Sequence, residues 1–474
     1  MPNATPPHPP AAAKHSRRSL RRPLAIVFCL LVSPIAAFVI WGRVEAARLN
    51  RALDALEARH EPLDVDKLDP RPSTEEQRQA SHLYAQAGKL VGEAAGSRLT
   101  PVGKTIEELC ELPPGDRGRA ERIAALRKIE ATYAEVLNLL DRASALDAAG
   151  WDDADRPRRQ SLAALGPRSA GIVNLVRIGR LACTGDGEGA AAALLATLRV
   201  SRVLPPSFFG SLPVQTAHSL RSLLTLTSPS GRSLEALQKE YESRADEHAV
   251  EKRVLYTRAW WLSYTLPGDF SEPPPGFFDR RVSPVEALVT ALARPARDRR
   301  TRVDLAEFEE AIEAARQPWP AKFEAAAALS RKYPASAPPS RRGFVESLVR
   351  PFGGLRAGLN LDGTVWNAAE ALARTRASAG ALAIARYRLA HGGALPGSLG
   401  ELVPAYLAAP LIDPYTGSEL KYQHFGANYR VYSVGINRQD DGGVWDQRSD
   451  LQTSRRGDPK DVGIAVGWPS TELR

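Results

Sequence analysis

The sequence is poor in the residues and motifs that most often reveal a catalytic or metal centre. It has 3 cysteines and 8 histidines in 474 residues. His60, His218 and His248 stand alone, outside any HExxH motif or paired-histidine spacing. A GxSxG elbow and a P-loop are also absent. The sequence therefore favours a protein that is not an enzyme, although a site assembled from scattered residues leaves no such pattern.

The number and positions of the cysteines limit which disulfides the chain can form. Cys29 lies in the apolar run over 24–41, whereas Cys110 and Cys183 lie outside it. An oxidising compartment would allow the last two to pair. Spacing alone leaves that pairing open.

Positive charge is in excess, but it is concentrated at one end. The net charge is +9, and the first 23 residues contribute five basic residues and no acid. This segment is rich in proline and alanine, so we expect residues 1–23 to be disordered. Basic and acidic residues are interleaved elsewhere, which argues against a nucleic-acid partner.

Residues 24–41 form an uncharged run of 18 residues, the longest apolar segment of the chain. That length predicts a single transmembrane helix. Arg21 and Arg22 precede the run and favour a cytoplasmic N-terminus, with the bulk of the chain outside the cytoplasm. A cleaved signal peptide is the alternative, but Glu45 makes the cleavage site poor, so we expect an uncleaved anchor.

Residues 42–333 read as a helical region, because apolar residues recur there every three or four positions. The expected helices, with one more near the C-terminus, span 73–95, 117–149, 158–183, 187–204, 211–227, 233–265, 284–297, 304–316, 319–332 and 364–391. Glutamates 307, 309, 310 and 313 are expected on a solvated helix face. Proline-rich residues 334–356 are expected to form a linker and docking segment.

Residues 357–474 predict a small α+β module. A long helix over 364–391 ends at Gly392 and Gly393, since glycine accepts the left-handed geometry of a helix end. A proline-punctuated loop follows, with a turn over 413–417. Strands over 420–425 and 429–434 form a hairpin, and 462–466 supplies a third strand.

The order of these pieces resembles the C-terminal module of the major pseudopilins of type II secretion systems. The resemblance covers roughly a quarter of the chain: a helix, a loop with an Asp-Pro-aromatic-x-Gly turn, a hairpin, the Tyr-Ser-Val-Gly of 432–435 and an acidic Gly-Gly loop. The prepilin motif of that family is absent, and more than 300 residues separate the apolar run from the module. The resemblance implies a pseudopilin-like module placed on a different anchored protein.

In pseudopilins the corresponding loop binds calcium, and the resemblance carries this expectation over. The candidate ligands are Ser433, Asn437, Asp440, Asp441, Asp446 and Asp450. Several carboxylates this close repel one another, and calcium takes six to eight hard oxygen ligands from a flexible loop. A solvated turn is the alternative, because Asp, Asn and Gly are ordinary turn residues.

Together these features predict a mainly α protein with an N-terminal transmembrane helix, a multi-helix extracytoplasmic region and a C-terminal α+β module. The module contains a long helix and a short antiparallel sheet. We expect a single-pass protein of the bacterial inner membrane, with residues 24–41 in the membrane and the bulk periplasmic. Its function would be structural or interactive, linked through envelope proteins to a secretion or pilus-like assembly. An anchored enzyme or ligand-binding protein with its site in the helical region is the alternative.

Overall fold

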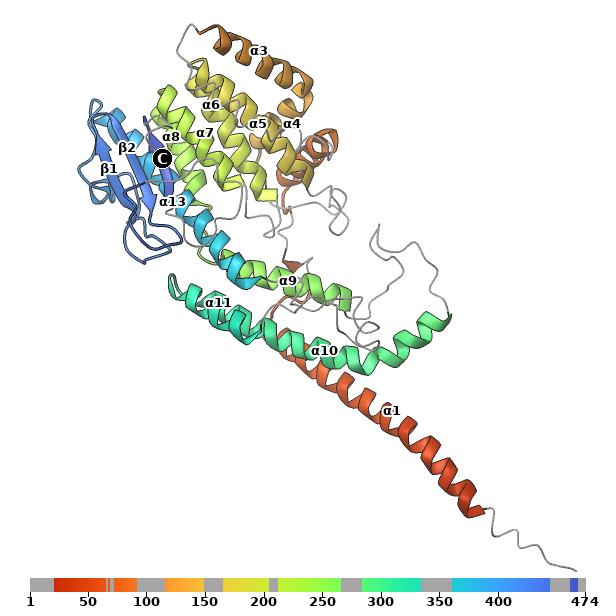
Figure 1. The fold of residues 1–474 in the computed structure, drawn as a ribbon. Coiled ribbons are helices and arrows are strands. Elements are labelled where there is room, and N and C mark those ends of the chain that lie inside the picture. Colours follow the sequence, from red (N-terminus) through yellow and green to blue (C-terminus); the bar gives the residue numbers. More distant parts are fainter. Residues whose placement is uncertain are drawn as a thin grey trace, which may run out of the picture.

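Helices dominate the computed structural model, and one small sheet lies at its edge (Figure 1). It describes residues 21–64, 67–68, 72–91, 116–148, 165–203, 212–265, 284–333, 360–443 and 461–467. Within these helices, the side chains of 21–31, 165–168, 212–214, 263–265 and 284–291 are not described. Residues 1–23 were expected to be disordered, and residues 1–20 of this segment lie outside the described residues. The expectation of a mainly α protein is confirmed.

The helices and strands follow the chain in a simple order. They are α1 (Arg21–Ala58), a helix over 75–91, α3 (Arg117–Thr132), α4 (Ala134–Ser144), α5 (Leu165–Cys183), α6 (Gly187–Val200), η3 (Ser201–Val203), α7 (Leu212–Leu226), α8 (Gly231–Glu242), α9 (Ala249–Thr265), α10 (Pro284–Arg316), α11 (Ala321–Lys332), α13 (Leu361–Ala390), η6 (Leu399–Leu402), β1 (Lys421–Phe425), β2 (Asn428–Ser433) and β3 (Val462–Val466).

The structure contradicts the expectation of a transmembrane helix over 24–41. Across the described part of the chain, no helix combines the length and the apolarity needed to cross a membrane. The side chains of 21–31 lie outside the described residues. The mainly α fold therefore stands without the membrane span that the sequence predicted.

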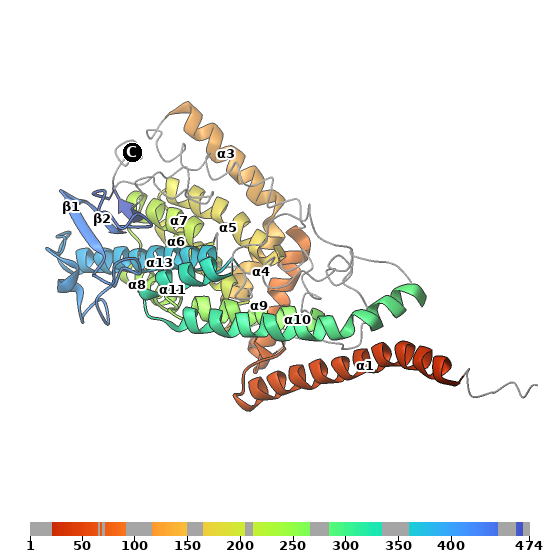
Figure 2. The same cartoon turned by 60° about the horizontal axis from the view of Figure 1, so that its bottom comes forward.

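The second half of α1 packs against α10, and the two helices run side by side in Figure 2. Their close approach depends on Gly42, where an added Cβ would lie 3.2 Å from Pro295 Cγ. Glu45 is buried in this interface and accepts a hydrogen bond of 2.9 Å from Arg48. Arg302 of α10 lies 3.6 Å from the same carboxylate. Packing and charge thus hold α1 on the helical body.

Several helix boundaries differ from the expected ones. The expected helix over 117–149 is two helices, which meet at Tyr133 with ψ of 22° and a backbone N–H shared between two carbonyls. The helix expected over 233–265 is likewise two, α8 and α9. In contrast, the helices expected over 284–297 and 304–316 are one continuous helix, α10. The expected gap over 298–303 is helical, α10 packs against α1, and Asp298 and Thr301 in this gap are buried.

Helix α13 is the centre of the fold. It contacts α7, α8 and α11 on the helical side and β2 and β3 on the other side (Figure 1). Leu382, Ala383 and Ile384 are completely buried. They share one core with α6, α8 and the sheet residues Val431 and Ile464. The small residues of α13 let its neighbours approach closely, since a Cβ at Gly380 would lie 2.8 Å from a Leu411 methyl group.

The sheet is antiparallel in the order β1-β2-β3, which confirms the expected short antiparallel sheet. Lys421 pairs with Tyr432 across the hairpin, and Ser433 pairs with Val462 on the other side of β2. Every residue of β3 is buried. The reason is that α7 and α13 both pack against this strand.

The expected domain boundaries remain a prediction. The linker over 334–356 lies outside the described residues. The module over 357–474 and the helical region over 42–333 share the core around α13. An isolated C-terminal fragment would therefore expose apolar surface that the whole chain buries.

Gly463 tests the packing of β3. A Cβ at this position would lie 2.3 Å from the Val431 carbonyl oxygen, so backbone would have to move. We expect Gly463→Ala to lower the free energy of unfolding by about 1–3 kcal/mol in urea denaturation. Gly231→Ala is the control, because nothing lies within 4 Å of the added methyl group. Equal stability of the two variants would contradict the described packing.

Candidate functional site

A buried carboxylate joins the turn over 413–417 to the end of β2. Asp413 is 1% exposed. Its Oδ1 accepts hydrogen bonds from the Tyr415 N–H at 2.9 Å and from Ser433 Oγ at 2.8 Å. Its Oδ2 accepts from the Val434 N–H at 3.1 Å. Ser433, a predicted calcium ligand, is therefore engaged in a structural network with Asp413.

The acidic loop begins directly after β2 and reverses at two glycines. Gly442 and Gly443 have φ of 74° and 76°, a left-handed geometry that glycine adopts at little cost. At Gly443 a Cβ would also lie 2.6 Å from the Arg430 side chain. The shape of the loop over 434–443 therefore explains why two glycines occur at 442 and 443.

Asp440 and Asp441 of this loop already have hydrogen-bond donors. Asp440 Oδ1 accepts from the Tyr432 hydroxyl at 3.1 Å and from the Gly442 N–H at 3.0 Å. Lys421 Nζ lies 3.7 Å from Asp440 Oδ2. Asn437 Nδ2 donates to Asp441 Oδ2 at 2.8 Å. The loop is therefore ordered by its own side chains.

Asp461 completes the cluster, and the sequence did not predict its part. It is 1% exposed and accepts from the Asp441 N–H at 3.3 Å and the Gly443 N–H at 2.6 Å. Burial, together with the negative charges of Asp441 and Asp440, raises the pKa of Asp461 to about 6, against the lowering effect of the two N–H donors. Asp461 immediately precedes β3, and the end of β2 pairs with the start of β3. A prediction of this strand pairing could therefore have placed Asp461 beside the loop that follows β2.

The structure therefore brings together three of the predicted ligands, Asn437, Asp440 and Asp441, and adds Asp461. Asp446 and Asp450 lie outside the described residues. Among the side chains that the structure describes, no three His, Cys, Asp or Glu residues are grouped closely enough to hold a metal ion. The atoms that these side chains could offer to a metal ion are hard oxygens, which suit calcium better than zinc. The calcium site remains a prediction.

Of the four glutamates expected on a solvated face of α10, Glu313 is exposed, Glu309 and Glu310 are partly exposed, and Glu307 lies in a different environment. Glu307 is 2% exposed, so the expectation is wrong there. Glu309 lies 3.1 Å from the guanidinium of Arg258, which is completely buried and also contacts Glu61. These carboxylates neutralise a buried cation and join the end of α1 to α9 and α10.

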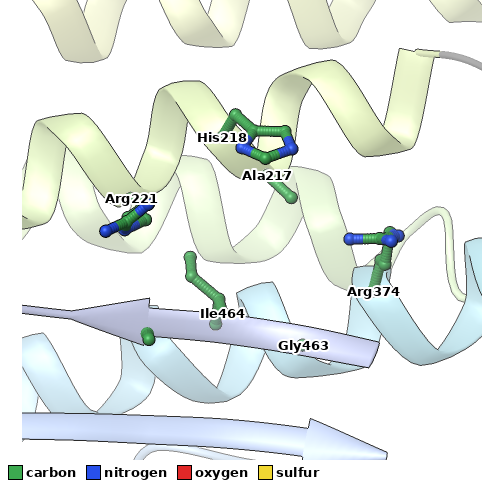
Figure 3. A pocket seen from close by; sticks show the side chains of 7 residues that line it. Ala217, His218, Arg221, Arg374, Gly463 and Ile464 are labelled. Atoms are coloured by element: carbon green, nitrogen blue, oxygen red, sulfur yellow. The ribbon is translucent and has the colours of Figure 1, made fainter. Parts of the chain in front are cut away.

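A second candidate site is a small pocket where α7, α13 and β3 meet (Figure 3). His218 and Arg221 of α7 and Arg374 of α13 line it, together with Ala217 and residues 463–465 of β3. Arg374 is 4% exposed and is 3.0 Å from Glu370, one turn earlier in α13. Sequence reasoning treated His218 as isolated, because the other cationic residues come from distant parts of the chain or carry no motif.

Removal of the Asp413 carboxylate should weaken the sheet module. We expect Asp413→Ala to lower the free energy of unfolding by about 3 kcal/mol, because three donors lose their acceptor in a buried site. Ser433→Ala removes one of these donors and should cost about 1 kcal/mol. Urea denaturation of the two variants measures both values. An Asp413→Ala variant as stable as the wild type would contradict the described network.

Comparison with known proteins adds no relative to this picture. The chain matches no family model, no curated protein and no solved structure at a significant level. The resemblance to pseudopilins therefore rests on the residues of this chain and remains a prediction.

Proposed function

We propose that this protein is a structural or interaction protein of the bacterial envelope whose C-terminal loop is stabilised by calcium. One observation carries the proposal. The backbone N–H groups of Asp441 and Gly443, in the acidic loop after β2, donate to the buried carboxylate of Asp461, which precedes β3, and the charges of Asp440 and Asp441 act on that carboxylate. A cation at this point would tie the loop to two strands of the sheet.

The electrostatics of the cluster support a cation. Asp461 is buried, and the charges of Asp440 and Asp441 act on it. Two cationic groups lie at the loop: Lys421 Nζ is 3.7 Å from Asp440, and the Arg430 guanidinium donates to the Gly443 carbonyl at 3.2 Å. The raised pKa of Asp461 reflects the cost of keeping its charge in this place. A bound calcium ion would offset that cost and favour the ionised form.

The arrangement of the module supports an assembly role. A long helix, α13, lies on a three-stranded antiparallel sheet, and an acidic Gly-Gly loop follows the second strand. This is the order on which the resemblance to pseudopilins rests. We therefore propose envelope or secretion-system proteins as partners and a location outside the cytoplasm. Calcium modules outside cells bind with dissociation constants of about 0.1–1 mM.

The calcium prediction is best tested on the whole chain, because α13 shares its core with the helical region. At a calcium concentration one hundredfold above the dissociation constant, the free energy of unfolding should rise by about 2.7 kcal/mol. Chemical denaturation with calcium, with magnesium and with a chelator measures the shift. We expect the shift with calcium alone.

Two variants make this test specific to the loop. The double variant Asp440→Asn and Asp441→Asn should lose the calcium shift, because it removes two carboxylate ligands. Glu419→Gln is the matched control, since Glu419 is an exposed acid of the same module. A wild-type protein without a shift, or an equal shift in the double variant, would contradict calcium binding at this loop.

The location has a separate test. Alkaline phosphatase gains activity only where its disulfides form, that is, outside the cytoplasm. A fusion to the C-terminus of the whole chain is therefore expected to be active in a bacterial host. An inactive but intact fusion would contradict the proposed location and leave the calcium test unaffected.

A further inference from the structure

Three arginines gather around one buried glutamate where the ends of α4, α6 and α8 meet. Helix α6 packs against both α4 and α8. Arg199 lies in the last turn of α6, Arg202 lies in η3, and Arg244 follows α8 by two residues. Glu240, near the end of α8, is 4% exposed. This cluster shares no residue with either candidate site described above.

Glu240 is the acceptor that the three arginines share. Its carboxylate accepts a hydrogen bond of 2.6 Å from Arg202 and one of 2.9 Å from Arg244. Arg199 Nε lies 3.7 Å from the same carboxylate, which is an ion pair but too long for a hydrogen bond. Arg199 also donates to the carbonyl of the last residue of α4, and Arg244 donates to a carbonyl in the last turn of α6. The arginines are therefore held in place by the ends of three helices.

Positive charge exceeds negative charge in the buried part of this cluster. There the single carboxylate of Glu240 faces three guanidinium groups. Asp147 lies 3.4 Å from Arg202, but its side chain is 59% exposed, so water and salt screen its charge. Glu76, which accepts from the Asp147 N–H, is exposed as well. The carbonyls at the two helix ends add only partial negative charge.

Three buried donors of the cluster have no hydrogen-bond acceptor among the residues that the structure describes. They are Arg199 Nε, Arg244 Nε and the hydroxyl of Tyr84. Tyr84 belongs to the helix over 75–91 and is completely buried. Burial raises its pKa, and the charges of Arg199, Arg202 and Arg244 lower it, so the hydroxyl lies close to these guanidinium groups. Buried donors without an acceptor cost free energy, which a ligand that accepts from them would recover.

The three donors define the chemistry of such a ligand. It must accept several hydrogen bonds, and a negative charge strengthens each of them. A water molecule has two lone pairs for three donors and carries no charge to offset the arginines. A multiply charged oxyanion would be repelled by Glu240 and by the carbonyl ends of two helices. A small ion with one negative charge meets both requirements.

We propose that Tyr84, Arg199 and Arg244 bind one chloride ion. The ion accepts from the tyrosine hydroxyl and from the two Nε–H groups, and it thereby ties the helix over 75–91 to the ends of α6 and α8. The proposal goes beyond the proposed envelope function. It does not depend on calcium, because the acidic loop and this cluster have no residue in common.

Chemical denaturation of the whole chain in sodium chloride and in sodium gluconate, at equal ionic strength, tests the proposal. Gluconate is a bulky anion that a buried site of this kind excludes. At a chloride concentration ten times the dissociation constant, the ratio of folded to unfolded protein should be about tenfold higher than in gluconate. Broadening of the chloride resonance in chlorine magnetic resonance reports binding to the folded chain directly.

Variants connect the ion to the cluster. Tyr84→Phe removes one donor and keeps the ring, so chloride should bind about tenfold more weakly. In gluconate this variant should be at least as stable as the wild type, because it no longer buries an unpaired hydroxyl. Arg199→Lys keeps the charge but lacks the Nε–H group, and it should also weaken chloride binding. Circular dichroism shows whether each variant is folded.

Tyr429→Phe is the matched control. The Tyr429 hydroxyl is buried like that of Tyr84, but it donates to the Ala381 carbonyl at 3.1 Å. Its loss should therefore lower stability to the same extent in chloride and in gluconate and leave the effect of chloride unchanged.

Three outcomes would overturn the proposal. The wild type could be equally stable in both salts and show no broadening of the chloride resonance. Chloride could act on Tyr84→Phe as strongly as on the wild type, which would place the ion elsewhere. Finally, sulfate could stabilise the wild type more than chloride does, with both Tyr84→Phe and Arg199→Lys abolishing that effect, which would assign the cluster to a divalent oxyanion.

Discussion

The burial of the middle of α13 is the constraint on which the rest of the structure depends. A surface helix hides one stripe, but α13 lies between the helical body and the sheet. Its middle therefore consists of small and aliphatic residues, such as Ala381 and Leu382, which are completely buried. A buried leucine contributes about 1.5–3 kcal/mol relative to an exposed one. Removal of either neighbour would expose this helix to water.

The two candidate sites follow from that arrangement. The Tyr429 hydroxyl of β2 donates to the Ala381 carbonyl at 3.1 Å and thereby seats the sheet on α13. Asp413 then attaches the preceding turn to the end of β2, where the acidic loop begins. On the other side, β3 lies between α7 and α13, and its middle residues line the cationic pocket. Strand β3 thus connects the acidic cluster, through Asp461, to the pocket.

The sequence predicted local features well and long-range features poorly. The period of α13, the glycines at its end and the hairpin at Gly426 all depend on neighbours within a few residues, and the structure bears them out. The roles of Asp461 and Arg374 depend on contacts with distant elements. An uncharged run predicted a membrane span that the described helices do not provide.

The central claim is that the helical body and the sheet module form one cooperative unit around α13. Native-state hydrogen exchange of the whole chain tests it most directly. Amides in the middle of α6, α13 and β2 should exchange through one global opening, with free energies that agree within about 0.5 kcal/mol. If the β2 amides exchanged through an opening several kcal/mol cheaper while α6 stayed protected, the sheet would be an independent module and the account would be contradicted.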